Sequence, residues 1–416
     1  MIKKLFIASC LLLSVASFAQ QGTSSPYSYY GIGDVRYKGT AEMRAMAGIA
    51  VEQDSIHLNM DNPASYSNLK LTTFAVGGSY NTSKLKSGSV SEDATRTTLD
   101  YLAVGLPLGK IGVGFGLIPY SSVGYQIQTL STADGGVNSR YDGTGGLNKA
   151  FLGAAYKITP KFSLGADIHY NFGTIENSGL VFVNDVPVGT RQLNTSNLSG
   201  FDFSVGAMYQ TRIYKKISMF SSVSYKLESD LTSNNTNSVS AVNYNTDFNF
   251  SVVDADDEVS DTRILTLPSK LSVGLGIGEA RKWLVGAQAV VGSVGNLANS
   301  YNQSADVTYE KSTKYSIGGY FVPNYNSFSS YAKRIVYRAG LKYEKTGLVV
   351  KSESINDMGF TLGFGLPITG SFSNVNFGFE MGKRGTTNAG LIQENYANFS
   401  VGLSLNDRWF EKRKFQ

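Results

Sequence analysis

Asp167 and His169 are the residues whose types and spacing come closest to catalytic chemistry. They lie two positions apart in an extended segment, so their side chains point the same way and could act as general acid and base. Arg338 and Lys342 share one face of another segment and could hold a carboxylate. A lipase would also need a nucleophilic serine beside a histidine. Because the only other histidine is His57, we expect neither an enzyme, nor a metal site, nor a cofactor.

The elements that must position these side chains are short segments in which apolar and polar residues alternate. The segments 161–173 (KFSLGADIHYNFG) and 371–384 (SFSNVNFGFEMGKR) are the clearest examples. The same parity places several ionisable residues on the polar faces of their strands. They are Asp167, His169, Asp202, Arg338, Lys342, Glu344 and Glu380. A network of paired charges that braces an internal plug is favoured for them over a ligand site.

Fourteen strands are predicted, an even number, as bacterial single-chain barrels require. Short connections alternate with long ones along the chain, and the 322–333 connection is the exception, being moderately long where a short one is expected. The long connections are 82–95, 119–148, 174–199, 229–262, 294–313, 346–356 and 385–394. The predicted strands are 70–81, 96–106, 110–118, 149–158, 161–173, 200–211, 216–228, 263–278, 281–293, 314–321, 334–345, 357–366, 372–384 and 395–406.

The first nineteen residues have the form of a secretory signal peptide. Lys3 and Lys4 precede an apolar run that is too short to span a bilayer, and small residues lead to a cleavage site after Ala19. Cys10 resembles a lipoprotein cleavage site, but the apolar run ahead of it is short and continues past it. No second apolar run is long enough for a membrane helix. An exported chain of alternating strands is the pattern of a transmembrane β-barrel in the outer membrane of a Gram-negative bacterium.

Composition supports this class and excludes others. The 45 glycines and 12% aromatic residues suit turns, crowded lumen faces and aromatic girdles. A net charge of +5 without a dense basic stripe argues against nucleic-acid binding. The only cysteine is Cys10, so no disulfide is expected after the signal is removed. The acidic run 254–258 is interpreted as a solvated loop tip, because it lacks the spacing of a calcium loop.

Residues 20–69 do not alternate and precede the first predicted strand. A barrel needs no such prefix, whereas a hatch, or plug, inside the lumen would use one. The predicted division is therefore a signal peptide over 1–19, an N-terminal hatch over 20–69, a transmembrane barrel over 70–410 and a C-terminal tail over 411–416.

The order of these parts resembles the FadL/TodX family of outer-membrane transporters. The resemblance rests on the signal peptide, the Gly-rich prefix with its AMAGIAVEQDS stretch, the tripeptide Asn62-Pro63-Ala64 before the first strand, and about fourteen strands. SPYSYYGIGD, KRGTTNAGLIQENY and NDRWFEKRKF are similar to the branch found in Bacteroidota. The resemblance implies passive carriage of hydrophobic molecules, such as long-chain fatty acids or aromatic hydrocarbons, with sideways exit where the third strand is kinked.

Two groups of residues match parts of that family. Asn62, Pro63 and Ala64 match the hatch motif, and because proline fixes φ and asparagine bonds to turn backbone, they are expected to shape the hatch rather than touch ligand. The wall opening is expected at the end of the third strand. Pro119, Ser121, Ser122 and Gly124 lie there. Pro119 cannot donate to a sheet ladder, and it either opens the wall or simply ends the strand. The YDGTGGLN end of the following connection is polar, which departs from a site for fatty acids.

Two classes of function follow. The first is a passive outer-membrane channel for a small hydrophobic ligand, formed by a monomer in contact with outer-membrane lipid. The alternative is a non-transporting barrel that acts as a scaffold or partner in secretion or surface machinery, since a fold does not fix a function. A continuous apolar cavity that leads to a wall opening would favour the channel. A sealed lumen with a large exposed patch at one rim would favour the scaffold.

Overall fold

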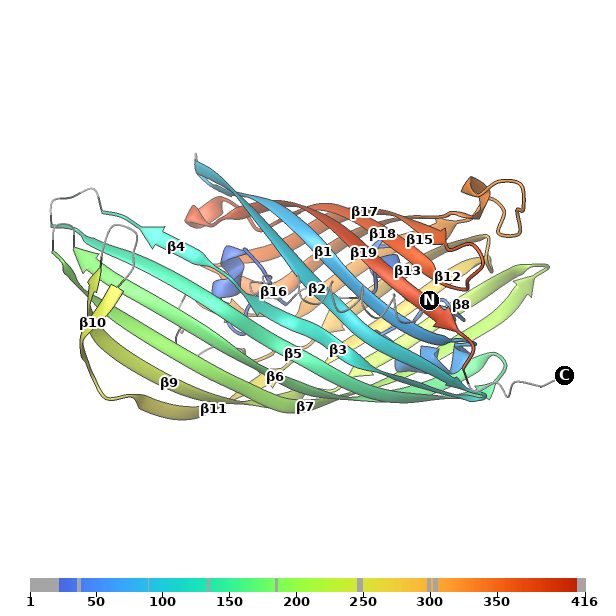
Figure 1. Cartoon of the computed structure of the whole chain (residues 1–416), viewed down its shortest axis with the longest axis horizontal. Coiled ribbons are helices and arrows are strands. Elements are labelled where there is room, and N and C mark those ends of the chain that lie inside the picture. Colours follow the sequence, from blue (N-terminus) through green and yellow to red (C-terminus); the bar gives the residue numbers. More distant parts are fainter. Residues whose placement is uncertain are drawn as a thin grey trace.

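The alternating segments form an antiparallel sheet that closes on itself in this computed structural model (Figure 1). The structure describes residues 22–409 except 36–38, 89, 132, 134, 184–185, 245–249, 298–300 and 302–305. The predicted signal peptide and C-terminal tail lie outside the described residues. The sheet closes because the last strand pairs with the first, from Thr72 opposite Asp407 to Lys86 opposite Gln393.

Nineteen hydrogen-bonded segments make up the fourteen strands of the barrel, which confirms the predicted strand number. β3 and β4 follow one another along β5, β8 and β9 lie along β7, β10 to β12 form one strand, and β14 and β15 lie along β16. The segments are β1 (Thr72–Ser87), β2 (Val90–Leu108), β3 (Ile111–Val123), β4 (Gln126–Thr129), β5 (Val137–Thr159), β6 (Phe162–Val183), β7 (Val188–Tyr214), β8 (Ile217–Lys226), β9 (Ser229–Tyr244), β10 (Phe250–Ala255), β11 (Val259–Leu267), β12 (Lys270–Glu279), β13 (Trp283–Gly292), β14 (Val307–Tyr309), β15 (Ser312–Phe321), β16 (Val336–Val350), β17 (Glu353–Pro367), β18 (Asn374–Arg384) and β19 (Gln393–Asp407).

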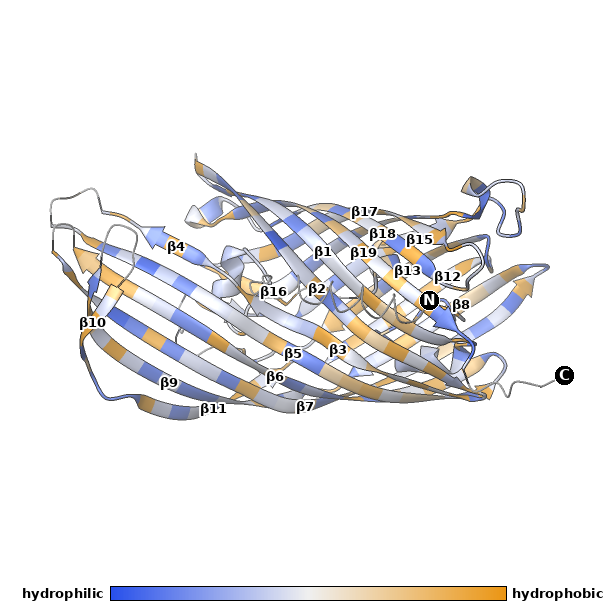
Figure 2. Cartoon of the chain, viewed as in Figure 1, coloured by the Kyte–Doolittle hydropathy of each residue, from blue (hydrophilic) through white to orange (hydrophobic). Residues whose placement is uncertain are grey.

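The outward faces of the strands carry large apolar side chains. On β12, for example, Leu271, Val273, Leu275 and Ile277 are exposed, while the residues between them face the lumen. Figure 2 shows that the apolar positions gather toward the end of the barrel where the C-terminus lies. An outward apolar band of this kind is what a barrel needs in order to face lipid. No helix among the described residues is long and apolar enough to cross a membrane.

Several segments predicted as long loops are strands instead. β5, β6 and β7 have 23, 22 and 27 residues, far more than a membrane crossing requires, and β9 to β11 cover most of the predicted 229–262 loop. In these extensions the outward-facing residues are mostly polar, as Asp230, Thr232 and Asn234 are on β9, so the alternation that marks a strand with an apolar outer face disappears. The backbone ladder continues nonetheless, supported by side-chain pairs such as Asn194 with Asn237 at 2.8 Å.

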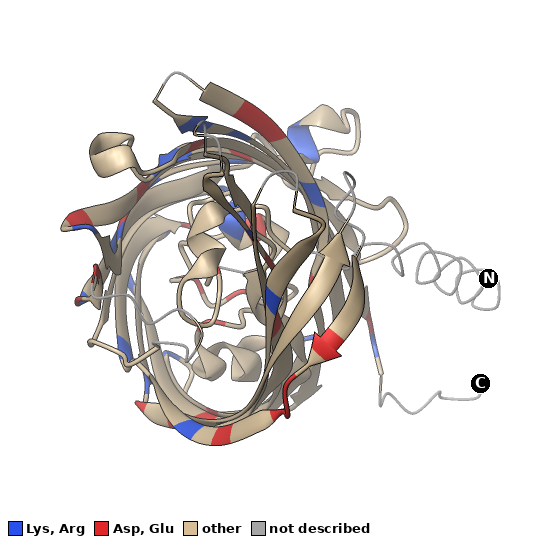
Figure 3. Cartoon of the chain, turned by 90° about the vertical axis from the view of Figure 1, so that its left-hand side faces the viewer, with Lys and Arg blue, Asp and Glu red and all other residues tan. Residues whose placement is uncertain are grey.

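The described residues before β1, which we call the N-terminal segment (22–35 and 39–71), lie within the ring of strands (Figure 3). Their regular parts are the short helices η2 (Pro26–Tyr29), α2 (Ala41–Arg44) and η3 (Pro63–Asn68). The segment is mostly buried, and η3 packs on β2, β3, β5, β6 and β7. Two further 3-10 turns lie in connections between strands, η4 (Ala332–Arg334) and η5 (Asn388–Gly390).

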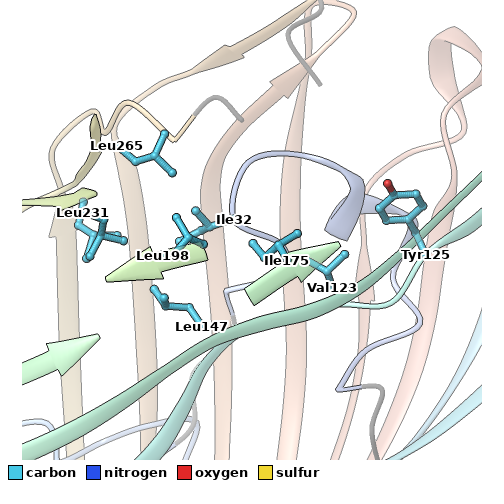
Figure 4. Close-up of a cluster of buried hydrophobic side chains, with 9 residues drawn as sticks. Ile32, Val123, Tyr125, Leu147, Ile175, Leu198, Leu231 and Leu265 are labelled. Atoms are coloured by element: carbon cyan, nitrogen blue, oxygen red, sulfur yellow. The ribbon is translucent and has the colours of Figure 1, made fainter. Parts of the chain in front are cut away.

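An apolar cluster joins the N-terminal segment to the wall. Ile32 of that segment packs among inward side chains from several strands, and Figure 4 shows most of them. The wall residues of the cluster are Val123, Tyr125, Leu147, Ile175, Leu198, Leu231, Leu265 and Leu267. Burial of this apolar surface stabilises the position of the segment inside the barrel.

Candidate functional site

The wall of the barrel is not hydrogen-bonded along its whole height between β2 and β3. The paired register of these strands stops at Leu102 and Leu117, although β2 continues along β1 and β3 continues along β5. We call this separation the seam. Pro119 lies in the continuing part of β3, where the register along β5 shifts between Pro119 and Ser121. The alternative that Pro119 ends the strand is therefore wrong.

The start of the N-terminal segment occupies the seam. From the β2 side, Arg96 Nε donates to the carbonyl oxygen of Thr23 at 3.3 Å. On the β3 side, the backbones of Asp34 and Ser122 exchange two hydrogen bonds of 2.8 and 3.2 Å. Gly124 packs so closely on this segment that an added Cβ would lie 2.0 Å from the Thr23 carbonyl oxygen. The segment thus bonds to both strands where they no longer bond to each other.

The tripeptide predicted as a hatch motif ties the other end of the N-terminal segment to the wall. Asn62 caps η3, and its side chain accepts a hydrogen bond from the Ala64 amide at 3.0 Å. The same side chain donates to the carbonyl oxygens of Ala207 and Val223 and to the Ser222 hydroxyl, at 3.2, 3.0 and 2.9 Å. Asn62 therefore fixes both a local turn and the position of that turn against β7 and β8.

Glycines in the wall allow this close packing. An added Cβ at Gly206 would lie 2.0 Å from the Asn62 side-chain oxygen, and one at Gly165 would lie 2.6 Å from the Ala64 nitrogen and from the Pro63 carbonyl carbon. A larger residue at either position would push the motif away from the wall, so Gly165 and Gly206 belong to the same site as the motif.

Asp202, one of the predicted lumen residues, is the centre of a buried charge network. It is 0% exposed, and its carboxylate lies 2.7 Å from His169 Nδ1, 3.0 Å from Lys149 Nζ and 3.2 Å from Lys226 Nζ. Both lysine ammonium groups also lie over the ring of Tyr120, at 4.5 and 4.8 Å from its centroid. The two lysines were not among the residues predicted for the site, although strand parity places both on the inward face.

Asp167 and His169, read from the sequence as a possible acid–base pair, are not directly hydrogen-bonded. His169 Nε2 and the Asp167 carboxylate are 3.9 Å apart, and His169 instead faces Asp202. The Asp167 carboxylate accepts from the hydroxyls of Tyr66 and Ser204 at 3.3 and 3.4 Å. Because Tyr66 belongs to η3, Asp167 joins the N-terminal segment to the wall.

Arg338 also connects the wall to the N-terminal segment. Its Nη1 donates to the Asn376 side-chain oxygen at 3.0 Å, and Asn376 in turn donates to the Glu42 carboxylate of α2 at 3.4 Å. Arg338 is buried. This chain of contacts from Arg338 to Glu42 has the form of the bracing network that the sequence favoured over a ligand site.

Lys342 has two carboxylate partners of its own. Its Nζ lies 2.6 Å from Glu380 and 3.2 Å from Asp357. The Tyr396 hydroxyl donates to the Asp357 carboxylate at 2.6 Å and lies 3.2 Å from the Glu380 carboxylate. In this arrangement Arg338 and Lys342 contact different partners, so they do not form one carboxylate clamp.

Two cavities lie beside the N-terminal segment. The smaller, about 70 Å³, is lined mainly by polar and charged groups, among them Arg44, Lys342 and Glu380. The larger, about 260 Å³, touches the wall at Ile118, Pro119 and Tyr120, in the part of β3 beyond its pairing with β2. Four lysines, His169, two carboxylates and a few apolar side chains line it. These lysines, carboxylates and apolar residues are Lys149, Lys226, Lys270, Lys314, Asp61, Glu344, Met60 and Val290.

Three ionisable residues of the N-terminal segment, Glu52, Asp54 and His57, respond to pH in different directions. Burial raises the pKa of Glu52 to about 7, although the Tyr320 hydroxyl donates to it at 3.0 Å. Burial would raise the pKa of Asp54 as well, but the charge and hydrogen bond of His57 lower it to about 2. For His57, burial opposes the charged form, yet the Asp54 carboxylate at 2.7 Å raises the pKa above its ordinary value.

These shifts predict that the N-terminal segment is held less tightly as the pH rises. Glu52 contributes stability below its ordinary pKa of 4.5 and loses it as the pH rises through 7, and His57 loses its contribution above its ordinary 6.5. Asp54 contributes above its ordinary 3.8 and loses it only toward pH 2. Hydrogen exchange of residues 50–60, corrected for intrinsic rate, should be faster at about pH 8.5 than at about pH 5.5.

The Glu52→Gln variant is the control for this pH response. Its glutamine cannot ionise, so the part of the pH dependence that Glu52 supplies should disappear and the part that His57 supplies should remain, while exchange at the lower pH stays near that of the parent chain. Equal protection of residues 50–60 at both pH values in the parent chain would contradict the prediction.

Within the described ranges, no group of three or more histidine, cysteine or acidic residues is arranged to hold a metal ion.

The fold of this barrel is shared with several solved structures. A family model described as BamG matches residues 1–416. The chain is similar in structure to a Pseudomonas aeruginosa FadL homologue (TM-score 0.61, 10% identity, 91% of this chain and 99% of that chain). It is also similar to the P. putida toluene transporter TodX (TM-score 0.59, 15% identity, 89% and 98%) and to the CymD monoaromatic hydrocarbon channel (TM-score 0.57, 13% identity, 90% and 98%). No curated protein sequence matches the chain.

Proposed function

We propose that this chain, which belongs to the BamG family, is an outer-membrane channel that passes small hydrophobic compounds sideways through the seam. The observation that carries the proposal is the meeting of a cavity with an interrupted wall. The larger cavity reaches Ile118, Pro119 and Tyr120, and these residues lie beyond Leu117, where β3 stops pairing with β2. A compound in the lumen would therefore meet the wall where no backbone hydrogen bonds between β2 and β3 have to be broken.

The cavity lining bears on the kind of compound. Met60, Ile118 and Val290 supply apolar contact. Close to them, four lysines (Lys149, Lys226, Lys270 and Lys314) face three carboxylates (Asp61, Glu344 and Asp202), which leaves one positive charge in excess. An amphipathic molecule with a carboxylate head group and an apolar tail meets both needs. The sequence resemblance implies two substrate types, long-chain fatty acids and aromatic hydrocarbons. The mixed lining of the cavity favours the fatty-acid type over an uncharged aromatic hydrocarbon.

The N-terminal segment would act as the hatch of this channel. Asn62 fixes it to β7 and β8, and Thr23 and Asp34 fix it at the seam. Passage through the wall requires that the part at the seam moves while the part around Asn62 stays docked. At the seam, Asp34 also forms a buried ion pair with Arg384, so this pair would have to open when the segment moves.

Uptake of labelled laurate and of labelled toluene by intact cells tests the proposal. Ser272→Trp would fill the cavity, because Ser272 lines it beside Gln288. Val273→Trp is the matched control, since Val273 is the next residue of β12 and faces outward. We expect laurate uptake to depend on the chain, to fall to background with Ser272→Trp and to persist with Val273→Trp. Uptake of both compounds that is equal with and without the chain would refute a channel.

One observation favours the second candidate, a non-transporting barrel that serves as a partner in secretion or surface machinery. The two cavities adjoin, because Val35, Gly48, Lys314 and Glu344 border both of them. Together they do not form a continuous apolar path, because charged groups dominate the smaller cavity. If the uptake experiment fails, this candidate becomes the proposal. Its test is co-purification of the folded barrel with a defined stoichiometric partner, compared between the parent chain and Ser272→Trp, which should then bind equally.

A further inference from the structure

The connection between β15 and β16 presents aromatic side chains to the outside of the barrel. We call residues 322–335 the rim loop. Phe328 at its tip is 105% exposed, which is complete exposure, and Tyr325 and Tyr331 on either side are also exposed. A fully exposed phenylalanine leaves a large apolar surface in water, and an aromatic cluster of this kind on a protein surface indicates a binding function.

Hydrogen bonds give the rim loop a defined shape. Its base is closed by a bond of 2.8 Å from the Asn324 amide to the Lys333 carbonyl, and a 3.2 Å bond from the Ser327 amide to the Asn324 carbonyl forms a turn within it. The Tyr331 hydroxyl donates to the Pro367 carbonyl of the neighbouring hairpin at 3.1 Å. Phe328 is therefore held outward by the surrounding backbone.

The rim loop and its neighbouring turn are basic. Residues 322–335 contain Lys333 and Arg334 and no acidic residue. The adjacent turn adds Arg281, whose guanidinium lies 5.3 Å from the centroid of the Tyr325 ring, while Lys282 there is paired with Glu279 at 3.1 Å. A partner that fits this surface combines negatively charged groups with an apolar region that can take up the Phe328 side chain.

The position of the rim loop identifies the partner. Exposed aromatic residues flank its base, because Phe321 and Tyr337 face each other across β15 and β16 and Tyr337 contacts Phe364. Such aromatic residues mark the depth of a membrane interface. In Figure 1 the loop, in orange, leaves the outline of the barrel sideways at the end where the C-terminus lies. Its tip thus lies outside the barrel wall, beside the depth that these aromatic residues indicate for the membrane interface.

We infer that the rim loop is a binding site for anionic phospholipid, with Phe328 inserted between head groups whose phosphates contact Arg281, Lys333 and Arg334. Aromatic side chains suit the boundary between head group and acyl chain, and arginine forms paired hydrogen bonds with phosphate. This site is independent of the lumen and of transport. It anchors one sector of the rim, next to β15 and β16, to the leaflet on that side.

A site-specific fluorophore tests this inference in the full chain. Phe328→Cys, labelled with an environment-sensitive dye, is reconstituted in phosphatidylcholine vesicles with and without phosphatidylglycerol, and quenching by spin-labelled lipid and by aqueous iodide is measured. Thr369→Cys on the neighbouring exposed turn is the matched control. The gel mobility of unheated samples verifies that each variant is folded.

We expect quenching by lipid at position 328 to exceed that at position 369 and to increase at least about twofold when phosphatidylglycerol is present. The triple variant R281Q/K333Q/R334Q should remove that increase without removing the folded band. Equal access of iodide to both positions in every vesicle would overturn the inference. So would shielding of position 328 that occurs only in native membranes, because that would indicate a protein partner.

Discussion

Replacing Asn62 by alanine is expected to detach the η3 region of the N-terminal segment from the wall. The variant loses the cap of η3, worth about 1 kcal/mol, and the three side-chain hydrogen bonds to the Ala207 and Val223 carbonyls and to the Ser222 hydroxyl. Each of these hydrogen bonds contributes about 0.5–1.5 kcal/mol, so docking should weaken by about 2.5–5.5 kcal/mol in total. Hydrogen exchange over residues 56–69 and limited proteolysis measure the effect.

Two further variants make the Asn62 prediction specific. Gly206→Ala should loosen the same region from the opposite side, because its Cβ would overlap the Asn62 oxygen. Asn234→Ala, at an exposed position of β9 whose side chain contacts only the neighbouring strand in the bonds described, should leave exchange over 56–69 unchanged. Protection of residues 56–69 that survives both Asn62→Ala and Gly206→Ala would mean that packing alone holds the segment.

Replacing Asp202 by asparagine is expected to destabilise the barrel strongly. Asp202 is the carboxylate that compensates Lys149 and Lys226, and both lysines are largely buried beside it. Removing one partner of a buried ion pair costs about 3–5 kcal/mol, because the remaining charge has lost its compensation. The urea midpoint of unfolding, followed as loss of the folded gel band in detergent, should fall clearly below that of the parent chain.

A charge-balanced double variant separates charge from shape at this site. Adding Lys226→Met to Asp202→Asn removes one of the two uncompensated ammonium groups and should restore a large part of the lost stability. Asp256→Asn, at an exposed position, is the control for the loss of an acidic residue and should leave the midpoint unchanged. If the double variant is less stable than Asp202→Asn alone, hydrogen-bond geometry and not charge compensation dominates the network.

Strand parity was the part of the sequence that carried most information. It predicted the fourteen strands and the inward direction of Asp167, His169, Asp202, Arg338, Lys342 and Glu380. It could not predict how these side chains pair, because partners such as His169 and Asp202 come from neighbouring strands whose register is set by the whole ladder. Lys149 and Lys226 could have been found by the same parity, but their significance depends on the carboxylate between them.

The length of the strands was the main error, and its cause is physical. Alternation reports a sheet with one apolar face, so it ends where β5, β6 and β7 leave the apolar band. Backbone hydrogen bonds continue there because each strand still has a neighbour, as the Asn194 and Asn237 pair illustrates. Polar sequences rich in asparagine, serine and threonine therefore resembled loops.

What the sequence by itself determined is the barrel class, because an even number of alternating strands after a predicted export signal is typical of a barrel, which leaves no strand edge unpaired. It also determined the local role of Asn62, because a cap requires only its own neighbours. Only the tertiary structure decided where Asn62 docks, more than a hundred residues along the chain, and where the wall is interrupted. The seam arises because β2 and β3 continue along different neighbours, which is a property of the assembled sheet and of no single segment.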